Sequence, residues 1–428
     1  MTTLIIAVFV TGYLAIALEH ELKLNKTAPA LIIGVLTWVI YTAFTPDKEH
    51  LNWVLIEHLG DISSILFFLF GAMTIVELID SHDGFGLITK KITVSDKRKL
   101  LWIISILTFF MSSILDNLTT TIVMVSLLRK LISEKKLRLL FIGLVIIAAN
   151  AGGAWTPIGD VTTTMLWIGG QISTEETVKY LFIPSLVSLI IPLIVISFKL
   201  KGRMPAKDNL HHAQKTEYPN PNQKRNMLVI GLLTLIMVPV FKYFTHLPPF
   251  MGILIGLGIL WIYTDYLHRK VDSEKKKHMT LVSALHRVDF SSILFFLGIL
   301  LAVAALETAG ILETASAWLS KEIGNLNLIV ISIGLLSSVI DNVPLVAAAQ
   351  GMYDINVYPM NHYLWQFLTY CAGTGGSILI IGSAAGVAAM GMEKISFFWY
   401  VKNISLLALI GYLSGALIYI IERTYLAF

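Results

Sequence analysis

Two segments of the chain place the same polar residues in the same order inside apolar sequence. Ser112–Asn117 reads Ser-Ser-Ile-Leu-Asp-Asn, and Ser337–Asn342 reads Ser-Ser-Val-Ile-Asp-Asn 225 residues later. A charged side chain at the centre of a lipid bilayer costs between roughly 2.5 and more than 10 kcal/mol, so such residues usually serve a function. The repetition therefore predicts one site built from two halves, an arrangement found in secondary transporters with an internal repeat.

Other candidate ligands are oxygen donors close to interruptions in apolar runs. Carboxylate, amide and hydroxyl oxygens suit hard cations and do not suit soft metals. Gly152-Gly153 and Gly375-Gly376 let the backbone break and approach closely at two interruptions. The predicted cation- and proton-binding residues are Asp116, Asn117, Asn150, Thr156, Asp160, Thr162, Thr163, Asp341, Asn342, Ser377 and Ser383.

Three of these residues, Asp116, Asp160 and Asp341, are the predicted carboxylate ligands of a metal cation. Burial disfavours the ionised form of a carboxylate, whereas the N-terminus of a half-helix favours it. A group balanced between these effects can exchange a proton for a cation, and competition for the same oxygens then couples the two ions. The alternative is that these side chains only cap half-helices. That alternative is stronger for Asp160, because its counterpart in the second half is Ser383.

Further acidic residues stand at the ends of apolar spans. Glu77 and Asp80 end the third span, and Glu307 ends its counterpart in the second half. They are either proton-path residues or interfacial residues, and the sequence leaves both interpretations open.

The composition indicates a polytopic membrane protein. The chain is 56% hydrophobic and 14% charged, and its mean hydropathy is +0.75. Many apolar runs approach the roughly 20 residues that a transmembrane helix needs. The net charge of +4 comes from basic residues in short loops, which argues against a nucleic-acid partner. Cys371 is the single cysteine, so a disulfide framework or a cysteine-based metal site is excluded.

The repeat extends beyond the Asp-Asn segments. Asp61–Leu69 matches Asp289–Leu297, and Asn150–Gly153 matches Gly373–Gly376. The polar, proline-containing stretch between the halves is the predicted linker. The predicted organisation is therefore a first repeat over 1–200, a cytoplasmic linker over 201–225 and a second repeat over 226–428.

We expect an all-α fold in which each repeat has five spans and one re-entrant hairpin, with broken helices at the midplane. Broken backbone at that depth is tolerated only inside protein or along a wet cavity. The two arms of the first hairpin, about 100–115 and 118–128, are short for spans, and basic residues flank both. Five crossings per repeat require the second repeat to be inverted. This topology places 27 of the 32 Lys and Arg residues in the cytoplasm and both termini outside.

At these residues the chain resembles the NhaD-type sodium/proton antiporters of the ion transporter superfamily. The resemblance rests on Glu19-His20, on Gly71–Asp80, on both Ser-Ser-x-x-Asp-Asn segments and on Asn150–Thr163. It implies two inverted repeats, a homodimer formed through scaffold helices, and a moving domain that holds the hairpins. It also implies exchange of Na⁺ or Li⁺ for H⁺ in a membrane, which we expect to be the bacterial inner membrane, with no cofactor.

Three other functions are compatible with parts of the sequence. A sodium-coupled anion or dicarboxylate carrier of the same superfamily is the main alternative, although Asp116 and Asp341 would repel an anion. An intramembrane aspartyl protease also pairs Asp residues, but the repeat and the absence of a Gly-x-Gly-Asp motif argue against an enzyme. A purely structural membrane protein would have no reason to keep so many buried ionisable groups.

Overall fold

The computed structural model describes residues 1–17, 19–89, 94–203, 219–269, 271 and 279–425. Over these residues the regular structure is helical, apart from an isolated bridge between Asp96 and Arg203. Residues 204–218 of the predicted linker and 90–93 of the loop before the first hairpin lie outside the described residues.

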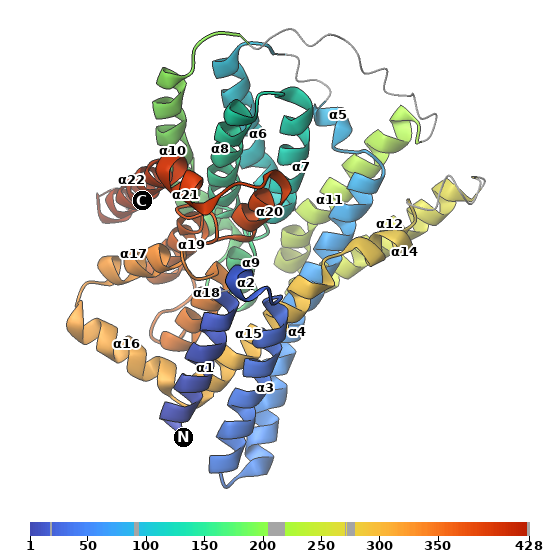
Figure 1. Ribbon diagram of the computed structural model, residues 1–428. Coiled ribbons are helices and arrows are strands. Elements are labelled where there is room, and N and C mark those ends of the chain that lie inside the picture. Colours follow the sequence, from blue (N-terminus) through green and yellow to red (C-terminus); the bar gives the residue numbers. More distant parts are fainter. Residues whose placement is uncertain (18, 90–93, 204–218, 270, 272–278, 426–428) are drawn as a thin grey trace.

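The first half holds the helices α1 to α10 (Figure 1). They are α1 (Thr2–Ala17), α2 (Glu19–Leu22), α3 (Thr27–Phe44), α4 (Lys48–Ser81), α5 (Gly86–Thr89), α6 (Lys97–Leu115), α7 (Asn117–Leu131), α8 (Lys135–Gly153), α9 (Val161–Ile168) and α10 (Thr174–Lys199).

The second half holds the remaining helices. They are α11 (Pro221–Thr245), α12 (Pro249–His268), α14 (Leu281–Arg287), α15 (Phe290–Thr308), α16 (Ile311–Glu322), α17 (Leu326–Leu336), α18 (Asn342–Met352), α19 (Tyr363–Gly375), α20 (Ala384–Glu393), α21 (Phe397–Tyr400), the π-helical segment η1 (Val401–Ser405) and α22 (Leu406–Tyr425).

Among the described residues, nine helices are long and apolar enough to cross a membrane. They include α4, α10, α11 and the segment Phe397–Thr424. The outward-facing side chains of these helices are largely apolar, as in Ile32, Val35 and Ile262. The chain is therefore an integral membrane protein of the all-α class, as the composition predicted.

Four breaks interrupt the apolar runs. α6 gives way to α7 at Asp116, and α17 gives way to α18 at Ser337–Asp341. α8 and α9 are separated by 154–160, and α19 and α20 by 376–383. Pro157 lacks a backbone donor, and Asp or Ser side chains cap the helices that follow these breaks, so local sequence explains why the helices stop there.

Two elements differ from the expected ranges. The third span begins at Lys48 rather than near residue 61, because Asp47 caps the amide of His50 and the intervening residues form a helix despite their polarity. In the described residues of the expected amphipathic piece at 83–95, the structure has the short helix α5, which ends at Thr89.

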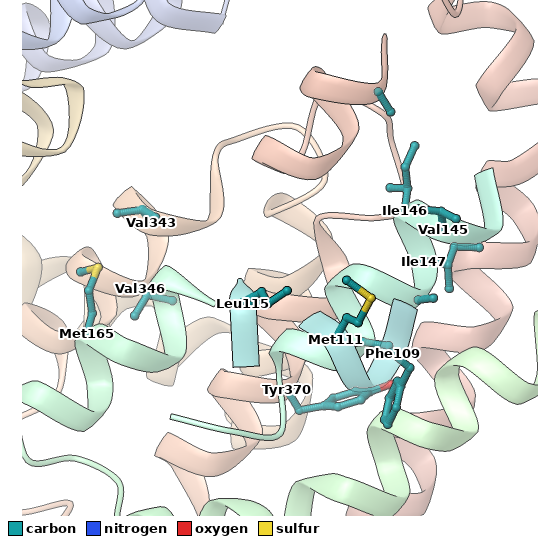
Figure 2. Packing of buried hydrophobic residues seen from close by; sticks show 14 of the residues in the cluster. Phe109, Met111, Leu115, Val145, Ile146, Ile147, Met165, Val343, Val346 and Tyr370 are labelled. Atoms are coloured by element: carbon teal, nitrogen blue, oxygen red, sulfur yellow. The ribbon is translucent and has the colours of Figure 1, made fainter. Parts of the chain in front are cut away.

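Packing joins the two halves around the breaks. Figure 2 shows Met165 of α9 lying beside Val343 and Val346 of α18, and all three belong to one buried hydrophobic cluster. α3 and α15 cross with their backbones in contact, because a Cβ atom on Gly34 would lie 2.5 Å from the carbonyl oxygen of Gly298. This close approach holds the middle of α3 against the middle of α15.

Candidate functional site

Asp160 lies at the centre of a polar network formed by both halves of the chain. Its side chain is buried, and its Oδ2 atom accepts hydrogen bonds from Asn117 Nδ2 (3.1 Å) and Asn342 Nδ2 (3.3 Å). Its Oδ1 atom accepts from the Thr162 amide at the start of α9 (3.5 Å). One carboxylate therefore joins the two Asp-Asn segments, which lie 225 residues apart in sequence.

The network continues through Asn150 to the second broken helix. Asn150 Oδ1 accepts from Asn117 Nδ2 (3.4 Å), and Asn150 Nδ2 donates to Ser383 Oγ (3.1 Å). Ser383 in turn accepts from the Gly386 amide (3.3 Å) and so caps α20. The structure thus brings Asn117, Asn150, Asp160, Asn342 and Ser383 together.

Asp116 serves its own helix while facing the same space. Its carboxylate accepts from the amide and the hydroxyl of Thr119, at 2.8 and 2.9 Å, and so caps α7. Its backbone has φ 75° and ψ 161°, a combination that residues other than glycine rarely adopt and that costs about 1–3 kcal/mol. A strained backbone conformation of this kind persists only where the surrounding structure enforces it, and it is common at functional sites.

Asp341 has a different partner. Its Oδ1 atom accepts from the Val343 amide (3.3 Å), and its Oδ2 atom pairs with Lys26 Nζ (3.1 Å). The described residues contain no cluster of three or more His, Cys, Asp or Glu side chains that could hold a metal ion. Asp116 thus also caps α7, and Asp341 also pairs with Lys26.

The remaining hydroxyls fall into two groups. Thr162 Oγ1 is buried beside Asp160 and has no hydrogen-bond partner among the described residues, which suits a site that accepts a cation. The others bond to nearby backbone: Thr156 to the Ser113 carbonyl, Thr163 to the Gly153 carbonyl, and Ser377, in the break after α19, to the Thr374 carbonyl near the end of α19.

A small cavity of about 70 Å³ adjoins this network. Its lining includes Asp116, Asn117, Asp160, Asp341 and Asn342. A water molecule needs roughly 10–15 Å³ of such space, so the cavity is large enough for a cation with a few waters. Pockets for organic ligands are far larger, at roughly 300 Å³ or more.

A wider cavity of about 430 Å³ adjoins the small one. Lys26, Met73 and Thr119 line both. The wider cavity also contains Glu77 and Asp80, and Glu77 pairs with Arg287 at 2.6 Å.

Glu307 lies elsewhere. It ends α15, next to the residue Thr308, whose hydroxyl bonds with His58 Nε2 at 3.1 Å. Glu307 lines neither cavity, so the three acidic residues Glu77, Asp80 and Glu307 do not share one site.

Comparisons with known proteins agree along nearly the whole chain. The protein-family model described as "Citrate transporter" matches residues 13–367. "Na(+)/H(+) antiporter NhaD" of Alkalimonas amylolytica is 32% identical, over 97% of this chain and 89% of that protein. This chain belongs to the NhaD-type family of sodium/proton antiporters. "Sodium/proton antiporter 1" of Arabidopsis thaliana is 50% identical, over 96% of this chain and 71% of that protein.

Sequence reasoning missed one residue at the site of this NhaD-type chain. Lys26 contacts Asp341 although the two residues are 315 positions apart, and no local pattern signals that contact. A usable signal existed in the isolation of Lys26, which with Lys23 is one of two basic residues between the first two spans.

Proposed function

We propose that this chain exchanges Na⁺ or Li⁺ for H⁺ across a membrane, with the cation passing through the cavity beside Asp160. The observation that carries the proposal is a buried carboxylate held by amides from both halves, next to two further carboxylates and an unpartnered hydroxyl. The relatives named as antiporters support the same exchange.

The proposed mechanism is competition for the same oxygens. Asp160 and Asp116 present carboxylate oxygens to the cavity, where bulk water is scarce and charge is costly. Protons neutralise these groups when the cation is absent, and the cation neutralises them when the protons have left. The amides of Asn117 and Asn342 hold the carboxylate of Asp160 in place in either case. Glu77 and Asp80 are proposed to relay protons through the wider cavity.

Two inverted repeats are also proposed, over 1–200 and 226–428 with the linker between them. Matching hydrogen bonds support the correspondence: Ser112 Oγ donates to the Ala149 carbonyl (2.6 Å), and Ser337 Oγ donates to the Ala372 carbonyl (2.9 Å). The order of spans and breaks is also the same in the two halves, whereas the short helix α2 follows the first span and the short helix α14 follows the second span of its half. In this scheme α6–α7 and α17–α18 are the re-entrant hairpins.

The assembly and the membrane are further parts of the proposal. The homodimer is a prediction. The bacterial inner membrane is also a prediction, because the relatives come from both bacteria and a plant. The anion carrier ranks second. The family model described as "Citrate transporter" supports it, but a small cavity lined by three Asp residues would repel an organic anion.

The test is proton flux in proteoliposomes that carry an imposed pH gradient. Na⁺ or Li⁺ should dissipate the gradient and K⁺ should not. Replacing Asp116, Asp160 or Asp341 by Asn should reduce that flux about a hundredfold or more, since loss of a carboxylate–cation contact in a poorly hydrated site costs about 3 kcal/mol. The exposed Glu134→Gln variant is the matched control. Wild-type protein with no cation-dependent flux would refute the proposal.

A further inference from the structure

Lys26 is the one basic residue that lines the cavity beside Asp160 in the described part of the chain. Its ammonium group lies 3.1 Å from Asp341 Oδ2 and 4.2 Å from the centre of the Phe295 ring. The Lys26 and Asp341 side chains are 24% and 17% exposed, so water screens their attraction only in part. An aromatic face and a carboxylate together form a cation-binding site. Here the Lys26 ammonium group is the cation that occupies it.

The backbone that carries Lys26 is firmly held. Thr27 Oγ1 donates to the Ser291 carbonyl (2.9 Å), and the Thr27 amide donates to Asn25 Oδ1 (2.9 Å). These contacts fasten the start of α3 to the start of α15, and the Gly34–Gly298 crossing lies farther along the same two helices. Lys26 therefore projects from a fixed pair of helices towards the first turn of α18.

The two repeated Asp residues, Asp116 and Asp341, differ in whether a basic side chain pairs with them. No ion pair joins Asp116 to any residue in the part of the chain that the structure describes. Its carboxylate accepts from the amide and hydroxyl of Thr119, whereas Asp341 has a full positive charge beside it. The site is thus asymmetric: one acid is open to a cation from solution, and the other already holds one.

We propose that Lys26 is a tethered competitor that occupies Asp341 until the transported cation displaces it, and so sets the apparent affinity for Na⁺. This inference rests on the proposed exchange function. Two cations cannot both make a close contact with one partly buried carboxylate without repelling each other. Na⁺ must therefore displace the Lys26 ammonium group to bind Asp341, and this displacement lowers its apparent affinity. When Na⁺ leaves, the ammonium returns and keeps the empty site neutral on that side.

The first test is transport kinetics in proteoliposomes. Lys26→Gln should lower the KM for Na⁺ at least about fivefold, the lower end of typical coupling between competing ligands, and should also lower kcat because release slows. Lys26→Arg, which keeps the charge, should stay within about twofold of wild type in KM. Lys23→Gln, at an exposed position on the same loop, is the control and should change neither constant. An unchanged or raised KM in Lys26→Gln would overturn the proposal.

A second test uses the wild-type protein, so its result does not depend on whether a variant folds. The Lys26 amine is labelled with an acylating reagent at fixed pH and quantified by mass spectrometry, with Na⁺ or K⁺ present. Na⁺ should increase labelling of Lys26 several-fold relative to K⁺ and leave Lys23 unaffected. Equal labelling in the two salts, in protein that shows Na⁺-driven proton flux, would overturn the inference alone. Absence of that flux in wild type would instead overturn the proposed function.

Discussion

At the scale of single residues, the two hydroxyls of the second broken helix do different work. Ser383 Oγ accepts from the Nδ2 atom of Asn150 and so orients the amide whose oxygen faces Asn117. Ser377 Oγ, in the break after α19, donates to the Thr374 carbonyl near the end of α19. Sequence alone could not separate them, because both follow the same pair of glycines in the same apolar run.

This difference makes a prediction. Ser383→Ala should raise the KM for Na⁺ roughly three- to tenfold, because one hydrogen bond that orients Asn150 is worth about 1 kcal/mol. Ser377→Ala should leave the KM within about twofold of wild type, since its hydroxyl bonds only to local backbone. The measurement is Na⁺-dependent proton flux at several Na⁺ concentrations. Equal effects in the two variants would contradict this assignment of roles.

At the scale of elements, a three-residue clamp ties the two halves together at the ends of their half-helices. Glu393, at the end of α20, pairs with Arg129 of α7 and with Arg138 of α8 (3.0 Å). Arg138 also donates to the Ile132 carbonyl (2.8 Å). The Glu393 side chain is 4% exposed, so its two partners compensate a costly burial. Glu393 and Arg129 lie outside the candidate spans, whereas Arg138 lies in the first turn of the span Lys135–Gly153. The clamp holds α20 against the first repeat.

The clamp should make stability depend on pH in one direction. Burial by itself would raise the pKa of Glu393, but the hydrogen bonds and charges of Arg129 and Arg138 outweigh it and hold the pKa below its usual range. A carboxylate with a lowered pKa in the folded state stabilises above its unfolded pKa of about 4.3, and that contribution is lost as the pH falls through the folded value.

Glu393→Gln should therefore lower the free energy of unfolding by about 2 kcal/mol between pH 5 and pH 8. This loss is smaller than that expected for a fully buried ion pair, because Arg129 is 46% exposed. The difference from wild type should shrink below about pH 4. The measurement is the apparent Tm in detergent as a function of pH, with Glu134→Gln as the control. A difference that grows on acidification would refute the clamp.

Sequence located the helix breaks well because their causes are local. Glycine pairs and capping Asp or Ser residues all act within a few positions of themselves, so the interruptions at Asp116 and Asp341 were visible. The contact between Lys26 and Asp341 was not visible, because it depends on how α3 packs against α15 and α18. The start of α4 was also predicted wrongly. The residues after Asp47 are too polar to resemble a membrane span, but they form a helix that Asp47 caps.

At the scale of the whole molecule, charge distribution argues for inversion of the repeats. Basic residues flank the turn between α7 and α8, in the last turn of α7 and the first turn of α8, whereas no Lys or Arg lies between residues 322 and 393, a stretch that includes the matching turn between α18 and α19. Short loops rich in Lys and Arg stay in the cytoplasm. The two matching turns should therefore face opposite sides of the membrane, with both termini outside.

Cysteine labelling tests this orientation, because Cys371 is buried and is the single cysteine of the chain. In a Cys371→Ser background, Ser133→Cys reports the first turn and Asn356→Cys reports the second, and both positions are exposed. A membrane-impermeant maleimide should label Asn356→Cys in intact cells, together with the outside marker Glu49→Cys, and should reach Ser133→Cys only after the membrane is opened. Labelling of both turns from one side would show that the halves run in parallel. The Asp-Asn tips would then enter from the same face, and a shared site near the midplane would lose its geometric basis.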